Sequence, residues 1–183
     1  DSGSLIHTST GLNSCSESLM VFEAIFEDLE IKDKVYKELK SVCPDDCLFF
    51  SNTSSIPISE INSKSKLSNK IIGFHFYNPP AVQKLVELIS MKETPKDFYE
   101  LSCELICSLN KIMVPSNDIA GFIGNGHFIR EGLKCINFAQ SLDMEFPKAV
   151  FYVNELISRV MVRPMGMFQL TDYVGLDVFK MIC

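Results

Sequence analysis

The sequence of 183 residues is poor in the features that mark membrane, secreted and nucleic-acid-binding proteins. No stretch reaches the roughly 18 apolar residues of a membrane-spanning helix, so no membrane span is expected. Residues 1–20 have neither the basic start nor the apolar block of a signal peptide. Lysine and arginine number 17 against 23 acidic residues, and the formal net charge of −6 argues against binding to nucleic acid. These absences favour a soluble, intracellular protein.

Motifs for metal binding and disulfide exchange are missing as well. Seven cysteines, an odd number, include no Cys-x-x-Cys pair, and histidine and cysteine do not cluster at metal-ligand spacing. Cys103 and Cys107 are four residues apart in a helical apolar pattern, which is typical of thiols packed in a core. We therefore expect no metal site, and this use of cysteine favours a reducing compartment.

Apolar residues are plentiful, at 46% of the chain, and they alternate between strand-like and helix-like segments. Short apolar runs typical of buried strands occupy residues 19–26, 47–50, 71–76, 85–89 and 111–115. Helical patterns occupy residues 31–42, 58–61 and 98–109 and then, beyond residue 118, residues 122–142, 147–162 and 172–179. Residues 1–18 are expected to form a loop. The order predicts an α/β domain with a mostly parallel sheet over residues 1–118 and an all-α domain over residues 119–183.

Residues 73–89 hold a histidine and a carboxylate, His75 and Glu87, in an otherwise apolar segment. The imidazole of histidine exchanges a proton near neutral pH, and a buried carboxylate that accepts its second N–H fixes the tautomer and stabilises the charged ring. Such a pair suits proton abstraction from an alcohol. Ser54 and His75 both follow predicted strands, so both can face the crevice where open sheets bind ligands. The structural alternative is a hydrogen-bonded core histidine beside a solvated strand-end carboxylate.

Three further motifs accompany this segment: Ser-Asn-Thr-Ser-Ser at 51–55, Gly-Phe-Ile-Gly-Asn at 121–125 and Arg-Pro-Met-Gly at 163–166. In this order and spacing, from about residue 22 to residue 179, the chain resembles the L-3-hydroxyacyl-CoA dehydrogenase family. The resemblance implies a Rossmann-type NAD-binding domain and a helical domain for substrate and dimer contacts. It also implies NAD as cofactor, an acyl-CoA substrate, a homodimer in the complete family member, and a place in β-oxidation or short-chain acyl-CoA metabolism, in the cytoplasm or the mitochondrial matrix.

The resemblance also assigns roles to individual residues. His75 is then the general base and Glu87 its orienting carboxylate, while Ser54 and Asn125 would hold the reacting substrate oxygen. The cofactor contacts that it implies are Glu27, Lys32, Ser54 and Asn78. Each has an ordinary alternative, because serine and asparagine favour turns and caps and charges at a helix start are usually solvated.

The sequence departs from the family pattern in three respects. It contains no Gly-x-Gly-x-x-Gly turn, which holds the dinucleotide pyrophosphate in a Rossmann domain. Gly126 stands where the family usually has arginine, and the sequence stops at Cys183, whereas family members continue well past the Pro-Met-Gly segment. We therefore expect an incomplete Rossmann-type domain and a partial helical domain. The alternatives are an incomplete form of a dehydrogenase, a non-catalytic remnant or binding subunit, and a related dehydrogenase of a small 3-hydroxy acid.

Overall fold

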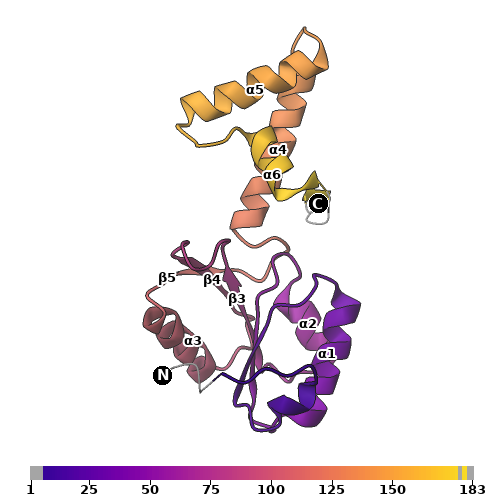
Figure 1. Cartoon of the computed structure of the whole chain (residues 1–183), viewed down its shortest axis with the longest axis vertical. Coiled ribbons are helices and arrows are strands. Elements are labelled where there is room, and N and C mark those ends of the chain that lie inside the picture. Colours follow the sequence, from indigo (N-terminus) through magenta and orange to yellow (C-terminus); the bar gives the residue numbers. More distant parts are fainter. Residues whose placement is uncertain (1–5, 177–178, 181–183) are drawn as a thin grey trace. The chain divides into compact units, whose positions relative to one another are not determined.

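The computed structural model describes residues 6–176, 179 and 180, and the chain divides into two compact units, Asp1–Phe122 (unit 1) and Ile123–Cys183 (unit 2) (Figure 1). The predicted boundary at residue 118 falls just before the end of unit 1. Residues 1–5 of the predicted loop and residues 177–178 of the last predicted helical segment lie outside the described residues. A 3₁₀ helix, η2 (Leu12–Cys15), interrupts the rest of the segment that was predicted as loop.

One sheet forms the centre of unit 1. Its described strands are β1 (Met20–Glu23), β2 (Leu48–Ser51), β3 (Ile71–Phe76), β4 (Leu85–Ile89) and β5 (Ile112–Ser116), in that spatial order. The β1–β2, β2–β3 and β4–β5 pairs are parallel, and only the β3–β4 pair is antiparallel. The predicted α/β class with a mostly parallel sheet is therefore confirmed.

The reversal between β3 and β4 follows from the connection that joins them. A parallel crossover needs about a dozen residues or more and usually contains a helix, whereas β3 and β4 are joined by the short loop of residues 77–84. As a result β4 runs back along β3, and Glu87 faces His75 directly across the ladder. The antiparallel direction therefore decides which residues meet at this point.

Helices cover both faces of the sheet. Helices α1 (Leu29–Val42) and α2 (Ile58–Ser65) lie on one face and α3 (Lys96–Ser108) lies on the other (Figure 1). Neighbouring residues of β2 serve opposite faces, as the two-residue period of a strand requires: Phe49 packs with Tyr36 of α1, and Phe50 packs with Phe98 of α3. Both faces are buried, which explains the nearly continuous apolar runs of the central strands.

Helix α1 begins at Leu29, two residues before the predicted start. The reason is a side-chain cap, because Asp28 Oδ1 accepts hydrogen bonds from the backbone N–H groups of Glu30 and Ile31, both at 2.9 Å. An aspartate in this position satisfies amides that have no partner within the helix. The cap fixes the end of the β1–α1 loop, which carries Glu27.

The described part of unit 2 is helical, with α4 (Gly124–Ser141), α5 (Phe146–Val160) and α6 (Met167–Val174). Its core contains small and medium-sized side chains from all three helices: Cys135, Ala139, Ala149, Val153 and Met167. Gly166 precedes α6, and a Cβ atom there would collide with Asn154, which explains the glycine of the Arg-Pro-Met-Gly motif. In the part of the chain that the structure describes, no helix is long and apolar enough to cross a membrane.

Candidate functional site

His75 and Glu87 lie side by side in the sheet of unit 1. They are direct cross-strand partners, with His75 Nδ1 3.5 Å from Glu87 Oε2 and side-chain exposures of 7% and 1%. The other carboxylate oxygen of Glu87 accepts a hydrogen bond from the hydroxyl group of Tyr77. Because the low dielectric of a buried site strengthens electrostatic interactions, Glu87 is well placed to stabilise a positive charge on His75.

Two aromatic rings lie near the His75 imidazole. The ring centroid of Tyr77 lies 5.3 Å away and that of Phe122 lies 5.9 Å away. Phe122 belongs to the Gly-Phe-Ile-Gly-Asn motif, where Gly121 takes a left-handed φ of 75°, a conformation that glycine adopts without strain. Sequence reasoning missed both rings, although Tyr77 follows His75 by two residues, the spacing that places side chains on one face of a strand.

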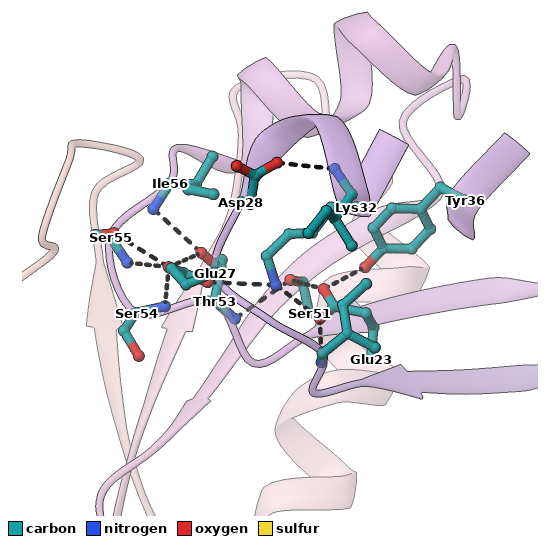
Figure 2. Close-up of polar contacts among 12 residues, drawn as sticks. Glu23, Glu27, Asp28, Lys32, Tyr36, Ser51, Thr53, Ser54, Ser55 and Ile56 are labelled. Carbon is teal, nitrogen blue, oxygen red and sulfur yellow. Dashed lines mark hydrogen bonds and ion pairs between the residues drawn. The ribbon is translucent and has the colours of Figure 1, made fainter. Parts of the chain in front are cut away.

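The turn between β2 and α2 carries Ser54 and is held by Glu27. Glu27 Oε1 accepts hydrogen bonds from Thr53 Oγ1 at 2.6 Å, from Ser54 N at 2.8 Å and from the N–H and hydroxyl groups of Ser55 at 2.9 and 3.1 Å (Figure 2). The Ser54 side chain points away from the Glu27 carboxylate in Figure 2. The carboxylate therefore fixes the backbone of the turn, and the Ser54 hydroxyl group points to the side of the turn that faces away from Glu27.

The surroundings of Glu27 keep it ionised. Burial would raise the pKa of Glu27, but the hydrogen bond from Thr53, the charge of Lys32 and the amides of Ser54 and Ser55 lower it, and the net pKa lies below its ordinary value of 4.5. Lys32 Nζ lies 3.3 Å from Glu27 Oε2 and 2.7 Å from Glu23 Oε1, and its side chain is 1% exposed. The alternative of a solvated charge is therefore wrong for Lys32.

A second contact ties the same turn to β3. The side-chain oxygen of Asn52 accepts a hydrogen bond from the backbone N–H of Phe76 at 2.9 Å. Phe76 directly follows His75, so the turn that carries Ser54 is anchored beside the strand end that carries the histidine. The Ser-Asn-Thr-Ser-Ser motif thus contains structural contacts at Asn52 and Thr53 that sequence reasoning did not assign.

The two remaining candidates come from other segments of the chain. Asn78 is exposed in the β3–β4 loop, where it precedes a cis Pro79. Asn125 lies in the first turn of α4, in unit 2. Their contacts with cofactor and substrate stay predictions. Among the described residues, no three His, Cys, Asp or Glu side chains are grouped so that they could hold a metal ion.

Comparison with known proteins supplies the family. Residues 2–119 match the family described as 3-hydroxyacyl-CoA dehydrogenase, NAD binding domain. The chain belongs to the 3-hydroxyacyl-CoA dehydrogenase family. The match covers nearly all of unit 1, which contains the His75–Glu87 pair and the Glu27 turn.

Individual members of this dehydrogenase family are similar in sequence to most of the chain. A 3-hydroxybutyryl-CoA dehydrogenase of Clostridioides difficile is 34% identical over 173 residues, 94% of this chain and 60% of the relative. The human mitochondrial hydroxyacyl-coenzyme A dehydrogenase is 33% identical over 98% of this chain and 56% of its own length. The crystal structure of M. tuberculosis FadB2 matches with a TM-score of 0.85 and 32% identity, over 95% of this chain and 60% of that one. The chain thus spans about three fifths of these relatives.

The residues at this edge of the 3-hydroxyacyl-CoA dehydrogenase sheet fit one half of NAD. The part-exposed carboxylate of Glu27, 23% exposed, can accept from ribose hydroxyls, and the exposed amide of Asn78 and the Ser54 hydroxyl can bond the carboxamide. The 183 residues contain no Gly-x-Gly-x-x-Gly turn for the pyrophosphate. The side chains present are of types that can bond ribose hydroxyls and a carboxamide, and their contacts with NAD stay predictions.

Proposed function

We propose that this chain carries the catalytic pair of an NAD-dependent dehydrogenase that oxidises L-3-hydroxyacyl-CoA to 3-oxoacyl-CoA. The observation that supports it is the buried contact of 3.5 Å between His75 Nδ1 and Glu87 Oε2. A carboxylate at Nδ1 favours the tautomer in which the other ring nitrogen, Nε2, accepts a proton. Nε2 of His75 is then the base for the 3-hydroxyl group of the substrate.

The proposed reaction removes a proton and a hydride from the alcohol. The hydroxyl proton moves to His75 Nε2, the C–O bond becomes a carbonyl, and the hydride leaves C3. Bound NAD supplies the acceptor for that hydride. Glu87 stabilises the imidazolium that forms, while Ser54 and Asn125 are the proposed hydrogen-bond donors to the reacting oxygen; such donors typically lower a barrier by about 2.7–4 kcal/mol each. The setting that we propose is fatty-acid β-oxidation or short-chain acyl-CoA metabolism.

A steady-state assay tests the proposal. The 183-residue chain is mixed with 3-hydroxybutyryl-CoA and millimolar NAD, and NADH is followed by its absorbance. His75→Ala should lower turnover by roughly a hundredfold to ten-thousandfold, the usual contribution of general base catalysis, while NAD binding changes little. His127→Ala removes an exposed histidine of α4 and is the matched control. Parental turnover in His75→Ala would remove the general-base assignment.

The second candidate, which the sequence left open, is a non-catalytic member of the family. The 183 residues lack the glycine turn whose N–H groups bond the pyrophosphate, and a hydrogen bond to a charged group is worth roughly 1.5–3 kcal/mol. Two missing bonds weaken NAD binding by about a hundredfold to ten-thousandfold. Isothermal titration with NAD separates the candidates, since micromolar affinity with ordinary turnover favours the enzyme, and no binding with no turnover favours the non-catalytic relative.

The cellular setting and assembly belong to the same proposal. Six described cysteines, Cys15, Cys43, Cys47, Cys103, Cys107 and Cys135, are free thiols. Free thiols support a reducing compartment, and we propose the cytoplasm or the mitochondrial matrix. We also propose the homodimer that the resemblance implies, and sedimentation velocity measures it.

A further inference from the structure

Glu23 is a buried carboxylate for which the proposed reaction has no use. It ends β1, is 4% exposed and accepts four hydrogen bonds. Its Oε1 bonds Ile25 N at 2.8 Å and Lys32 Nζ at 2.7 Å, and its Oε2 bonds Ser51 Oγ at 2.7 Å and Tyr36 Oη at 3.1 Å (Figure 2). The donors come from the β1–α1 loop, from α1 and from β2, so one side chain joins three segments.

Lys32 connects this carboxylate to Glu27. Its ammonium group lies between Glu23 Oε1 and Glu27 Oε2, at 2.7 and 3.3 Å, and only 1% of the side chain is exposed. A buried ammonium needs paired partners, because its desolvation is otherwise very costly. Glu23 makes the shorter contact and is the more buried of the two carboxylates, so it fixes where the ammonium group sits. Glu27 then pairs with an ammonium group whose position Glu23 has already fixed.

The hydroxyl group of Tyr36 is another of the four groups that donate hydrogen bonds to Glu23. Burial raises the pKa of Tyr36 well above its ordinary value of 10.0, and the charge of Glu23 raises it further. Tyr36 is therefore a neutral hydrogen-bond donor to Glu23 at neutral pH.

We propose that Glu23 is a positioning residue, which acts through Lys32 and Glu27 to fix the turn of residues 53–55 and thereby the place of Ser54. The role rests on the proposed function, in which Ser54 bonds the substrate oxygen. Because Glu23 is only 4% exposed, the proposed role is exerted through these residues and not by contact with substrate or cofactor. Its second route to the turn runs through Ser51, whose Oγ accepts a hydrogen bond from Thr53 N at 3.3 Å. Two connections from one carboxylate therefore converge on the segment that carries Ser54.

Amide hydrogen exchange tests this positioning without any need for activity. In the ¹⁵N-labelled 183-residue chain, Glu23→Gln keeps the shape of the side chain but removes its charge. Exchange of the Ser54 and Ser55 amides, which donate to Glu27 Oε1, should accelerate about tenfold to hundredfold, the factor that matches loss of one hydrogen bond to a charged group. The Ile106 amide in α3 should not change.

Asp33→Asn is the matched control. Asp33 is also a buried carboxylate of this region, but it accepts its hydrogen bonds from Lys37 Nζ at 2.7 Å and Ser65 Oγ at 3.0 Å, and both donors lie outside the turn of residues 53–55. Its amide variant should leave exchange at Ser54 unchanged. Should Glu23→Gln fail to fold, Tyr36→Phe removes a single donor to Glu23 and should accelerate the same amides severalfold.

Kinetics provide the second measurement. If the chain is active, Glu23→Gln should lower kcat about tenfold with little change in the KM for acyl-CoA, because a misplaced Ser54 weakens transition-state contacts more than substrate binding. Equal acceleration of exchange at Ser54 and Ile106, or none at either, would overturn the positioning role. An inactive parental chain would instead contradict the proposed function, and the exchange result at Ser54 would still decide the positioning of the turn.

Discussion

Removal of the Lys32 ammonium should destabilise unit 1 strongly. Lys32→Met keeps most of the apolar stem but leaves the buried carboxylate of Glu23 without its partner at 2.7 Å. Breaking a buried ion pair by removing one partner costs about 3–5 kcal/mol, because the remaining charge stays desolvated. Folded domains have free energies of unfolding of roughly 5–15 kcal/mol, so we expect the variant to fold with much reduced stability.

A neighbouring pair in the same helix supplies the control. Lys37 Nζ also lies 2.7 Å from a carboxylate, Asp33 Oδ2, but its side chain is 57% exposed. Exposed ion pairs contribute about 0–1 kcal/mol, so Lys37→Met should cost little. The two substitutions remove the same group from a carboxylate at the same distance, and they differ in burial and in the second carboxylate, Glu27, that lies 3.3 Å from Lys32. The difference between them therefore measures how much more the buried Lys32 ammonium contributes than an exposed one.

Urea unfolding followed by NMR gives the measurement. The amide peaks of Ile72 and Leu88, in β3 and β4, report on unit 1. With a slope of about 2 kcal/mol/M, Lys32→Met should lower the midpoint by about 1.5–2.5 M and Lys37→Met by at most about 0.5 M. The double variant Glu23→Gln/Lys32→Met should recover part of the loss, because the buried side chain at position 23 is then no longer a charge without its partner. Equal midpoint shifts for the two single lysine variants would refute the reasoning.

Three further outcomes are expected. Gly73→Ala should cost about 1–3 kcal/mol by overpacking, because the new Cβ atom would lie 2.8 Å from Ile89 Cβ, and thermal unfolding measures it. The net pKa of Glu27 is lowered, so its contribution to stability is complete above its ordinary value of 4.5 and is lost as the pH falls through the lowered pKa; urea midpoints of parent and Glu27→Gln should converge in acid. Burial raises the pKa of Cys47 to about 12, so iodoacetamide at pH 8 should label exposed Cys107 and reach Cys47 only after unfolding.

Several elements of unit 1 could be predicted because their cause is local. The strands of residues 48–51 and 71–76 are buried on both faces, and a continuous apolar run marks such strands directly. The start of α1 was missed by two residues, although Asp28 is a residue type that caps helices. Local sequence patterns therefore predict these strands and helices, and the error in the predicted start of α1 comes from a single side-chain contact, the Asp28 cap.

The arrangement of the site depends on contacts that no local pattern contains. His75 and Glu87 were expected to pair, but their meeting requires β4 to run antiparallel to β3 in one particular register, and a shift of one residue would turn Glu87 to the opposite face. The burial of Lys32 could not be predicted from a local pattern either. In the sequence it resembles Lys34 and Lys37 of the same helix, and only the end of β1, where Glu23 lies, makes Lys32 the buried one.

The charges around Lys32 do not balance among themselves, and this explains why the turn is built from so many donors. Glu23 and Glu27 bring two negative charges against the single positive charge of Lys32. The excess charge is met by neutral donors, namely hydroxyl groups and backbone amides of residues 53–55. Hydrogen bonds to an ionised acceptor are stronger than hydrogen bonds between neutral groups. The Glu27 carboxylate is therefore stabilised most when the turn adopts the conformation in which residues 53–55 donate to it. A neutral cluster would bind the turn less tightly, and Ser54 would lose the fixed position that an aimed donor requires.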